Sequence, residues 1–353
     1  MTAPNPHPEG SAWRHFVGVF LCVFFIGAAI VYIAILLVDP YGVVAFSLPL
    51  DRRIISIDQR HMYPQIVRSK RYDSFVIGSS TGRLLDPALL DKEFGGRFAN
   101  LSMNDMQAVE QKTMIELVLR TAGRPRMLIV GIDGVWCSVN ADKVQGMHGF
   151  PHWMYDDNPW NDYLYLLNTA AAEATIRLLA FQFGLYKERI RGDGYQVFTP
   201  PEERYDLAKA RKLIWSSREP QAVPDLAPRP LSDQERRSLS FPALAWLDNL
   251  LGQLPPSSVK VLAYMPIHVA AQPWPGTRDA AIEAECKARI AEIGRNRGAK
   301  VIDWRIASRI TREDSNYWDN LHYRVPIATR VAEELAEAVL LGEPSEDYRI
   351  VVP

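Results

Sequence analysis

Net charge is nearly absent from this sequence. It contains 40 lysine and arginine residues against 41 aspartate and glutamate residues, which gives a formal net charge of −1. Proteins that bind nucleic acid through its phosphates need a strongly basic face. We therefore expect no nucleic-acid partner.

Cysteine is also scarce, with only three in the chain. Cys22 lies within a long apolar run, so at most one disulfide can form, between Cys137 and Cys286. Such a pair would form in an oxidising compartment, but nothing in the local sequence predicts it. The cysteines alone therefore do not decide the compartment.

Charged residues and proline are missing altogether from residues 16–38, which read FVGVFLCVFFIGAAIVYIAILLV. As a helix this segment extends roughly 35 Å, against a hydrocarbon core of about 30 Å. A helix also satisfies its own backbone in lipid, which a loop or lone strand does not. A cleaved signal peptide usually has an apolar region of about 7 to 15 residues that ends at small residues. This run instead continues into Asp39 and Pro40. We predict a single transmembrane helix over 16–38.

The charges that flank this helix are nearly balanced. Arg14 and His15 precede it, and Arg52 and Arg53 follow it, so the positive-inside rule gives no clear direction. We favour a cytoplasmic leader, residues 1–15, because this segment is too short to fold and the large C-terminal part is what an anchor would display. The expected location is the inner (cytoplasmic) membrane, single-pass, with the globular domain facing the periplasm or cell exterior.

Beyond the helix, short β-rich runs alternate with amphipathic stretches. We expect a connector over 39–72, packed on the domain, and then strands at 74–77, 98–101, 127–130, 259–264 and 300–303. Apolar residues at three- and four-residue spacings predict helices at 107–121, 278–297 and 326–341. Strands that alternate with helices imply crossover units. We therefore predict an α/β fold, a three-layer α/β/α domain over 73–345 with a mainly parallel sheet.

A long insertion, at about 140–257, interrupts this alternation between the third and fourth strands. It is rich in Trp, Tyr, Pro and charged residues. Such an insertion either covers the functional edge of the sheet or is a structural elaboration. Residues 346–353 are expected to form a tail.

The first candidate for chemistry follows the first strand directly. Gly78-Ser79-Ser80 places a glycine turn and then serine at the carboxyl end of a strand, where open α/β sheets bind ligands. A helix that starts here would aim free N–H groups at an oxyanion. On its own, such a turn is more often a helix cap or a phosphate cradle than a nucleophile.

The second candidate lies before the last predicted helix, where Asp319 and His322 are three residues apart. Histidine is suited to take a hydroxyl proton near neutral pH, and a nearby carboxylate fixes its tautomer. The alternative is that Asp319 caps the closing helix and that His322 is a polar surface residue.

Together, Gly78-Ser79-Ser80 and Asp319-Asn320-Leu321-His322 resemble the SGNH/GDSL hydrolase superfamily. The resemblance is strongest to its membrane-anchored branch, which includes proteins similar to the D-alanyl transfer protein of teichoic acids and to alginate O-acetylation factors. It implies an SGNH-like fold with Ser80 as nucleophile and Asp319 and His322 as its catalytic partners. Ser79 stands where the family has the aspartate of its GDSL pattern.

The resemblance also implies oxyanion donors after the second and third strands, where this sequence departs from the family pattern. Asn104 stands near the place of a glycine, and Asp133 stands where the family has an asparagine. The Asn104 amide can donate, whereas an ionised Asp133 has no proton to give and opposes an oxyanion. Asn104, Asp133 and Ser79 are therefore candidate oxyanion or substrate-binding residues.

Other histidines are weaker candidates. His268 follows the fourth strand at the same sheet edge, so it either lines the substrate pocket or has a structural role. His148 and His152, near Asp156 and Asp157, match no standard metal-ligand spacing. We predict no metal and no cofactor.

These features lead to one hypothesis and one rival. The hypothesis is a membrane-anchored SGNH-like serine esterase or O-acyltransferase that modifies a cell-envelope polysaccharide or glycolipid through an acyl-serine intermediate. A multispanning membrane acyltransferase is its expected partner. The rival is a catalytically silent SGNH-like protein that binds glycan or scaffolds an envelope assembly.

Overall fold

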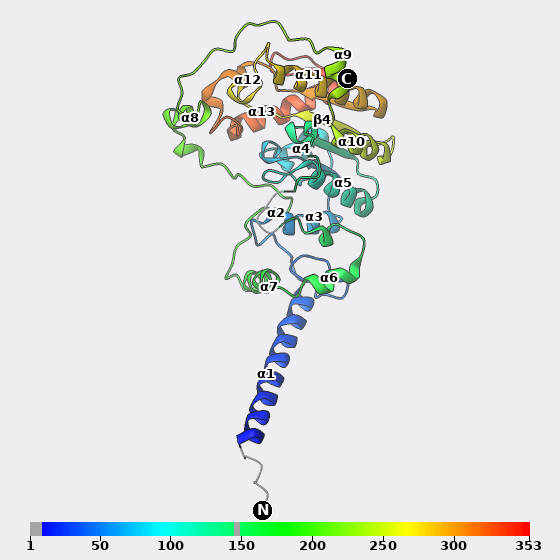
Figure 1. Ribbon diagram of the computed structural model, residues 1–353, viewed down its shortest axis with the longest axis vertical. Coiled ribbons are helices and arrows are strands. Elements are labelled where there is room, and N and C mark those ends of the chain that lie inside the picture. The colour runs from blue at the N-terminus through cyan, green and yellow to red at the C-terminus, as the bar shows by residue number, and fades with distance from the viewer. Residues whose placement is uncertain (1–8, 145–148) are drawn as a thin grey trace, which may run out of the picture. The chain divides into compact units, whose positions relative to one another are not determined.

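The computed structural model describes residues 9–144 and 149–353 (Figure 1). Most of the predicted leader 1–15, together with His148, therefore lies outside the described residues. Contacts divide the chain into two compact units. The first combines Met1–Ser56 with Asp156–Arg189, and the second combines Ile57–Tyr155 with Ile190–Pro353.

The first unit contains the long helix α1 (Glu9–Val38), drawn in blue in Figure 1. Its stretch Ala12–Val38 is long and apolar enough to cross a membrane. Most of its large apolar side chains are exposed, whereas Ile35 and Val38 near its end are buried. The end of α1 lies beside α6 (Pro159–Tyr165) and α7 (Thr169–Gln182), and α1 packs against α7.

A tight turn follows α1. Asp39 is buried, and its carboxylate accepts the N–H groups of Val43 and Val44 and the hydroxyl of Ser47. The connector is divided between the units, because 39–56 belongs to the first unit and 57–72 to the second. The second part forms α2 (Gln59–Met62) and α3 (Pro64–Arg68).

The second unit contains a six-stranded sheet in the order β2-β1-β3-β4-β5-β6. Its strands are β1 (Ser74–Ile77), β2 (Phe98–Asn100), β3 (Met127–Gly131), β4 (Val259–Tyr264), β5 (Ala299–Asp303) and β6 (Arg349–Val352). The first five strands are parallel, and β6 is antiparallel to β5. The five predicted strands are present, and the segment expected as a tail supplies the sixth.

Helices cover both faces of the sheet. They are α4 (Pro87–Phe94), α5 (Ala108–Ala122), α10 (Pro242–Gln253), α11 (Arg278–Arg297) and α13 (Val325–Ala336), which a π-helical turn extends through Glu337–Leu341. Contacts join α4 to α13, and α10 to both α5 and α11. Right-handed crossovers place the first pair on one face and the other three on the opposite face. The predicted α/β/α layering is therefore confirmed.

Shorter helical segments connect these layers. They are η1 (Ser80–Gly82), η2 (Gly134–Cys137), η3 (His152–Met154), η4 (Glu202–Arg204), α8 (Leu207–Ile214), α9 (Asp233–Ser238), η5 (Val269–Ala271), α12 (Arg309–Arg312) and η6 (Asp314–Asn316). The core is continuous between the sheet and the α4/α13 layer, where Val76, Ile129 and Ile302 join one buried cluster with Leu90 and Leu335.

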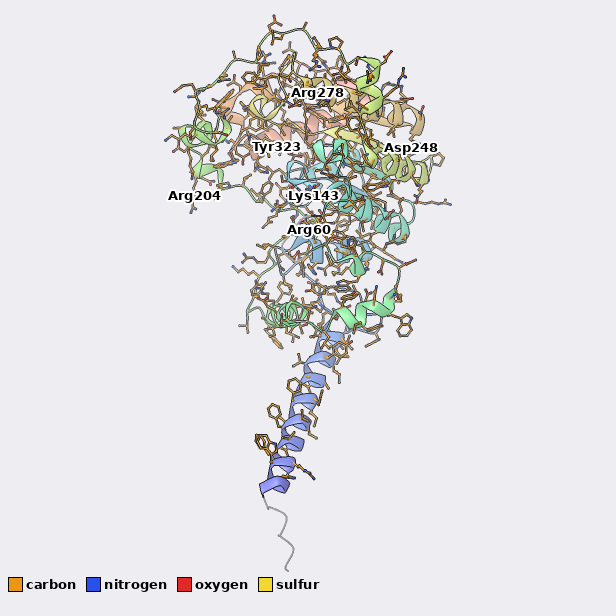
Figure 2. The ribbon with its side chains drawn as sticks, in the orientation of Figure 1. Arg60, Lys143, Arg204, Asp248, Arg278 and Tyr323 are labelled. Carbon is orange, nitrogen blue, oxygen red and sulfur yellow. A yellow bond between two sulfur atoms is a disulfide. The ribbon has the colours of Figure 1, made fainter. Side chains whose placement is uncertain are left out.

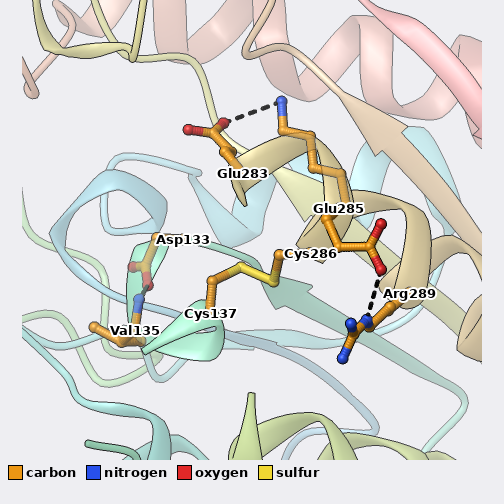
Figure 3. Close-up of a disulfide and its surroundings, with 8 residues drawn as sticks. Asp133, Val135, Cys137, Glu283, Glu285, Cys286 and Arg289 are labelled. Carbon is orange, nitrogen blue, oxygen red and sulfur yellow. Dashed lines mark hydrogen bonds and ion pairs between the residues drawn. A yellow bond between two sulfur atoms is a disulfide. The ribbon is translucent and has the colours of Figure 1, made fainter. Parts of the chain in front are cut away.

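A disulfide links two layers of this unit. Cys137 at the end of η2 is bonded to Cys286 on α11, with their Cα atoms 5.9 Å apart (Figure 3). The only disulfide that the sequence allowed outside the apolar run is therefore formed.

Candidate active site

Ser80 lies directly beyond the carboxyl end of β1. The chain turns at Gly78, where a Cβ would lie 3.2 Å from the Cα of Gly131 at the end of β3. Glycine thus permits β1 and β3 to approach closely at this edge of the sheet. Ser79 has an extended backbone, and Ser80 is the first residue of η1. Because the first N–H groups of a helix have no partner within it, the Ser80 N–H is positioned as a donor.

Asp319 and His322 lie on a short loop whose shape is set by local hydrogen bonds. The Trp318 N–H donates to the His322 carbonyl over 2.9 Å, which closes the loop. Asp319 Oδ1 accepts the N–H groups of Leu321 and His322, each at 2.8 Å. The N-cap of α13 is Arg324, so Asp319 does not cap the closing helix.

The structure brings the three predicted catalytic residues into one hydrogen-bonded row. His322 Nε2 lies 2.8 Å from Ser80 Oγ, and His322 Nδ1 lies 2.8 Å from Asp319 Oδ2. A carboxylate can only accept, so Nδ1 carries the proton in the neutral histidine. Nε2 is then free to accept the Ser80 hydroxyl. This is the arrangement of a Ser-His-Asp triad.

The electrostatics of this row favour an ionised aspartate. Burial opposes the charge on Asp319, but the hydrogen bond and positive charge of His322 and two backbone N–H donors outweigh it. They hold the pKa of this carboxyl below its ordinary value. Asp319 therefore stays charged while it orients His322 and stabilises the imidazolium.

A second hydrogen bond links the loop that carries His322 to the turn that carries Ser80. Tyr323 follows His322 in the chain and is labelled in Figure 2. Its hydroxyl donates to the backbone carbonyl of Thr81. Tyr323 is buried in the core cluster. The loop of His322 and the turn of Ser80 are thus fixed to each other by side chain and backbone together.

These residues open onto a cavity of about 800 Å³. Its polar lining beyond the triad consists of Ser79, Thr81, Asn104, Asp105, Asp133, Glu283 and Arg305. Phe198, from the insertion predicted at 140–257, also lines the cavity and packs edge-on against the His322 ring at a centroid distance of 5.3 Å. At least this part of the insertion therefore contributes to the functional edge of the sheet.

No family model matches the chain, and no curated protein matches it. Any role for the cavity must therefore be argued from its own geometry. Among the residues that the structure describes, no group of three or more His, Cys, Asp or Glu side chains is placed to hold a metal ion.

Asn104 is held in one orientation by Arg83. Arg83 Nη1 donates to the side-chain oxygen Oδ1 of Asn104 over 2.6 Å. The backbone N–H of Asn104 donates to Gln59 Oε1 over 2.9 Å. A guanidinium can only donate, so the amide oxygen of Asn104 faces Arg83 and its NH₂ group points elsewhere. Because Asn104 also lines the cavity, its NH₂ group is a candidate donor there.

Arg83 is an unusual residue to find at this depth, because only 4% of its surface is exposed. Its guanidinium donates to the neutral side chains of Asn104 and Gln196 and lies 4.2 Å from the Phe198 ring centroid. Burial lowers the pKa of Arg83. A buried positive charge one hydrogen bond from Asn104 polarises that amide as a donor.

Asp133 also lines the cavity, with a carboxylate that accepts the Val135 N–H over 3.1 Å. Burial raises the pKa of Asp133 above its ordinary value. The charge of Arg305 and hydrogen bonds from Ser79 and Val135 act in the opposite direction. Asp133 is therefore a donor only in its protonated form.

Ser79 and Ser80 have different surroundings. The Ser79 hydroxyl interacts with Asp133 and lies 3.4 Å from Thr81 Oγ1, whereas Ser80 contacts His322. Of the two serines, Ser80 is therefore the one that is hydrogen-bonded to the histidine.

His268 is not brought to the cavity, which corrects its prediction as a substrate-binding candidate. The residue is 0% exposed, and its Nδ1 accepts the Ala270 N–H over 3.1 Å. Its Nε2 lies 3.2 Å from Asp314 Oδ1, and its ring packs edge-on against Trp215 and Tyr317. Burial lowers the pKa of His268 although Asp314 raises it. Its role is to join η5 to η6.

Phe198, Glu283 and Arg305 are among the cavity residues that were not predicted from the sequence. Phe198 and Glu283 come from segments whose distance from Ser80 depends on the path of a loop and the rotation of a helix. Arg305 follows β5 at the same sheet edge as the other candidates. Its position just beyond the carboxyl end of a predicted strand is the sequence feature from which Arg305 could have been predicted as a cavity residue.

Proposed function

We propose that this protein is a membrane-anchored serine esterase or O-acyltransferase of the SGNH type. The carrying observation is the hydrogen-bonded row of Ser80, His322 and Asp319 at the mouth of a cavity. Nucleophile, base and orienting carboxylate stand in the order that acyl transfer requires.

Acyl transfer at this site proceeds in two halves. Ser80 Oγ attacks the ester carbonyl carbon while His322 Nε2 takes the hydroxyl proton. The carbonyl becomes an oxyanion, for which the Ser80 N–H and the Asn104 amide are the available donors. Collapse breaks the ester C–O bond, His322 returns the proton to the leaving alcohol, and the acyl group remains on Ser80.

The second half repeats the chemistry with a new nucleophile. Water or a sugar hydroxyl attacks the acyl-serine, and His322 takes its proton and then returns it to Ser80 Oγ. Water gives a free acid, and a sugar hydroxyl gives a new ester. The choice between esterase and O-acyltransferase therefore depends on which acceptor occupies the cavity.

The proposed acceptor is a cell-envelope polysaccharide or glycolipid. The cavity combines carboxylates, an amide, a guanidinium and an aromatic ring, which are groups that bind hydroxyl-rich ligands. The apolar stretch of α1 supports a membrane anchor, and the Cys137–Cys286 disulfide supports an oxidising compartment outside the cytoplasm. A multispanning acyltransferase in the same membrane is the proposed source of acyl groups.

A fluorophosphonate probe tests the nucleophile. The full chain in detergent should be labelled, and Ser80→Ala should abolish the labelling. Ser238→Ala is the matched control, because it removes an exposed hydroxyl on α9 and leaves the row intact, so it should label at a similar rate. Equal labelling of the wild type and Ser80→Ala would overturn the assignment.

One observation favours the silent rival, namely the carboxylate of Asp133 at a place where a donor is needed. Turnover of p-nitrophenyl acetate separates the two functions. The enzyme hypothesis requires turnover that is lost in His322→Ala. A folded protein that binds envelope glycan and turns over no ester would instead support the scaffold.

The orientation is tested separately. Alkaline phosphatase fused after Pro353 is active only outside the cytoplasm, and a green fluorescent protein at the same place is fluorescent when it remains inside. Phosphatase activity without fluorescence is expected. The reverse pattern would place the site in the cytoplasm.

A further inference from the structure

Large apolar side chains are exposed on α6, α7 and the segments that follow them. They are 59% to 81% exposed and comprise Trp160, Leu164, Leu167, Ile176, Phe183 and Leu185. We call residues 159–186, together with the turn 39–52, the α6–α7 lobe. Large exposed apolar side chains gathered in one segment of the chain mark a site of contact with protein or membrane.

Aromatic rings gather on one side of this lobe. The rings of Phe46 and Tyr163 stack at 5.9 Å with an interplanar angle of 8°, and Trp160 lies 6.1 Å from Tyr163. Trp160 and Leu164 are four residues apart on α6 and share a face. Tryptophan and tyrosine are the residues enriched where a membrane meets water.

Hydrogen bonds fix the lobe at the level of the last turns of α1. The Tyr32 hydroxyl donates to the Tyr163 carbonyl over 2.6 Å, and the Leu48 N–H donates to the Leu37 carbonyl over 2.7 Å. Tyr32 lies within the apolar stretch Ala12–Val38, about 9 Å before its end. A helix anchored by this stretch therefore brings α6 to the membrane surface.

The apolar surface of the lobe continues that of α1. Ile30, Ile33 and Leu37 remain exposed on the helix at the level where the lobe packs against it. The apolar residues of the lobe end at the charged run Lys187-Glu188-Arg189. An amphipathic element at an interface has this pattern, with an apolar face against lipid and charge beyond it.

We propose that the α6–α7 lobe lies in the boundary between lipid headgroups and acyl chains, as a second membrane contact beside α1. Trp160, Leu164 and Phe183 enter the acyl region, and the stacked rings of Phe46 and Tyr163 lie among the headgroups. This inference rests on the anchoring role of α1 in the proposed function. It is independent of the acyl-transfer chemistry.

Depth-dependent quenching tests the lobe in the full chain. In a Cys22→Ser background, with the disulfide retained, an environment-sensitive nitrobenzoxadiazole label is attached to Leu164→Cys or Phe183→Cys. Val23→Cys in the middle of α1 reports on the anchor, and Gln234→Cys on α9 is the exposed control. The protein is reconstituted in phosphatidylcholine liposomes that contain lipid with a nitroxide at acyl carbon 5 or 12, and iodide is the aqueous quencher.

We expect labels at Leu164 and Phe183 to be quenched best by the carbon-5 nitroxide. Their iodide quenching constants should be at least about fivefold smaller than that of Gln234, as expected for burial at the headgroup boundary. The label at Val23 should be quenched best by the carbon-12 nitroxide.

The possible failures are distinguishable. If iodide quenches the labels at Leu164 and Phe183 as strongly as that at Gln234, while Val23 is quenched by the carbon-12 nitroxide, the lobe does not contact the membrane. The proposal is then overturned, and the anchoring role of α1 stands. Protection from both iodide and nitroxide shows that a protein partner or a second copy covers the surface, which also overturns the lipid contact. Loss of quenching at Val23 removes the anchor, whereas fluorophosphonate labelling of Ser80 tests the chemistry independently.

Discussion

The guanidinium of Arg83, three residues along the chain from Ser80, donates a 2.6 Å hydrogen bond to the side-chain oxygen of Asn104, which lines the same cavity as Ser80. A second arm donates to Gln196 over 2.8 Å. This fork fixes which end of the amide is available to a substrate. It also brings a buried positive charge close to the place where an ester carbonyl would become negative.

Arg83→Lys should lower kcat for p-nitrophenyl acetate roughly ten- to a hundredfold, because one ammonium group does not reproduce the fork. KM should change little, since Arg83 is not among the residues that line the cavity. Asn104→Ala should cost roughly a hundredfold or more in kcat, as for loss of an oxyanion donor. Steady-state kinetics measures both.

The double variant of Arg83→Lys and Asn104→Ala distinguishes positioning from a merely structural role. If Arg83 acts through Asn104, the double variant is no slower than Asn104→Ala alone. Fully additive losses would contradict this. Arg297→Lys, which alters an arginine on α11 that pairs with Asp248, is the matched control.

The raised pKa of Asp133 predicts a pH-dependent effect of Asp133→Asn. Below this pKa the carboxyl is neutral and can donate, so the wild type and the variant should have similar kcat/KM. Above it the carboxylate opposes the oxyanion, and the variant should be faster by roughly tenfold, which corresponds to about 1.4 kcal/mol. The ratio of the two kcat/KM values between pH 4 and 8 is the measurement, because other titrations common to both proteins cancel.

Asp248→Asn, far from the cavity in sequence and paired with Arg297, should give a ratio that is flat with pH. A flat ratio for Asp133→Asn as well would mean that its charge does not act on the reaction.

The strands that are buried on both faces could be predicted from the sequence. The segment Val259–Tyr264, for example, is a near-continuous apolar run with the same bounds in the structure. β6 was missed because a four-residue edge strand buries only Val352 fully. The first unit was also missed, since its segments 39–56 and 156–189 are distant in the chain and associate only in three dimensions.

The same limit applies to the site. Ser80, Asp319 and His322 could be placed from their positions beyond the first strand and before the last helix. The orientation of Asn104 depends on a hydrogen bond from Arg83, and the pKa of Asp133 depends on burial. His268 follows β4 at the expected edge of the sheet, but its ring is buried between Trp215 and Tyr317.

His268→Phe should destabilise the fold by about 2 to 3 kcal/mol and leave KM unchanged. The ring is retained, but the Ala270 N–H loses its acceptor, and the Asp314 carboxylate loses one partner while it keeps Arg211 and Trp215. The pKa of His268 is lowered in the fold, so the folded state binds fewer protons than the unfolded state below the ordinary value. Its contribution to stability is present above the ordinary pKa and is lost as pH falls through the folded pKa.

Thermal unfolding from pH 7.5 to pH 5 measures this contribution. The wild-type Tm should fall more steeply with decreasing pH than that of His268→Phe. His152→Phe, at an exposed histidine, should retain the wild-type slope. A rise in KM with unchanged stability would return His268 to the substrate pocket.

Removal of both disulfide cysteines, Cys137→Ala with Cys286→Ala, should lower the free energy of unfolding by about 2 to 4 kcal/mol. The bond closes a loop with a sequence separation of 149. It joins η2, whose N-cap Asp133 and residue Val135 line the cavity, to α11, which carries Glu283 (Figure 3). We therefore expect a lower Tm and a lower kcat together.

Dithiothreitol should shift the wild-type Tm toward that of the double variant and leave the double variant unchanged. Cys22→Ala, in α1, is the control that should respond like the wild type. Titration of three free thiols in the unreduced wild type would show that the bond is not formed, and would remove its support for a site outside the cytoplasm.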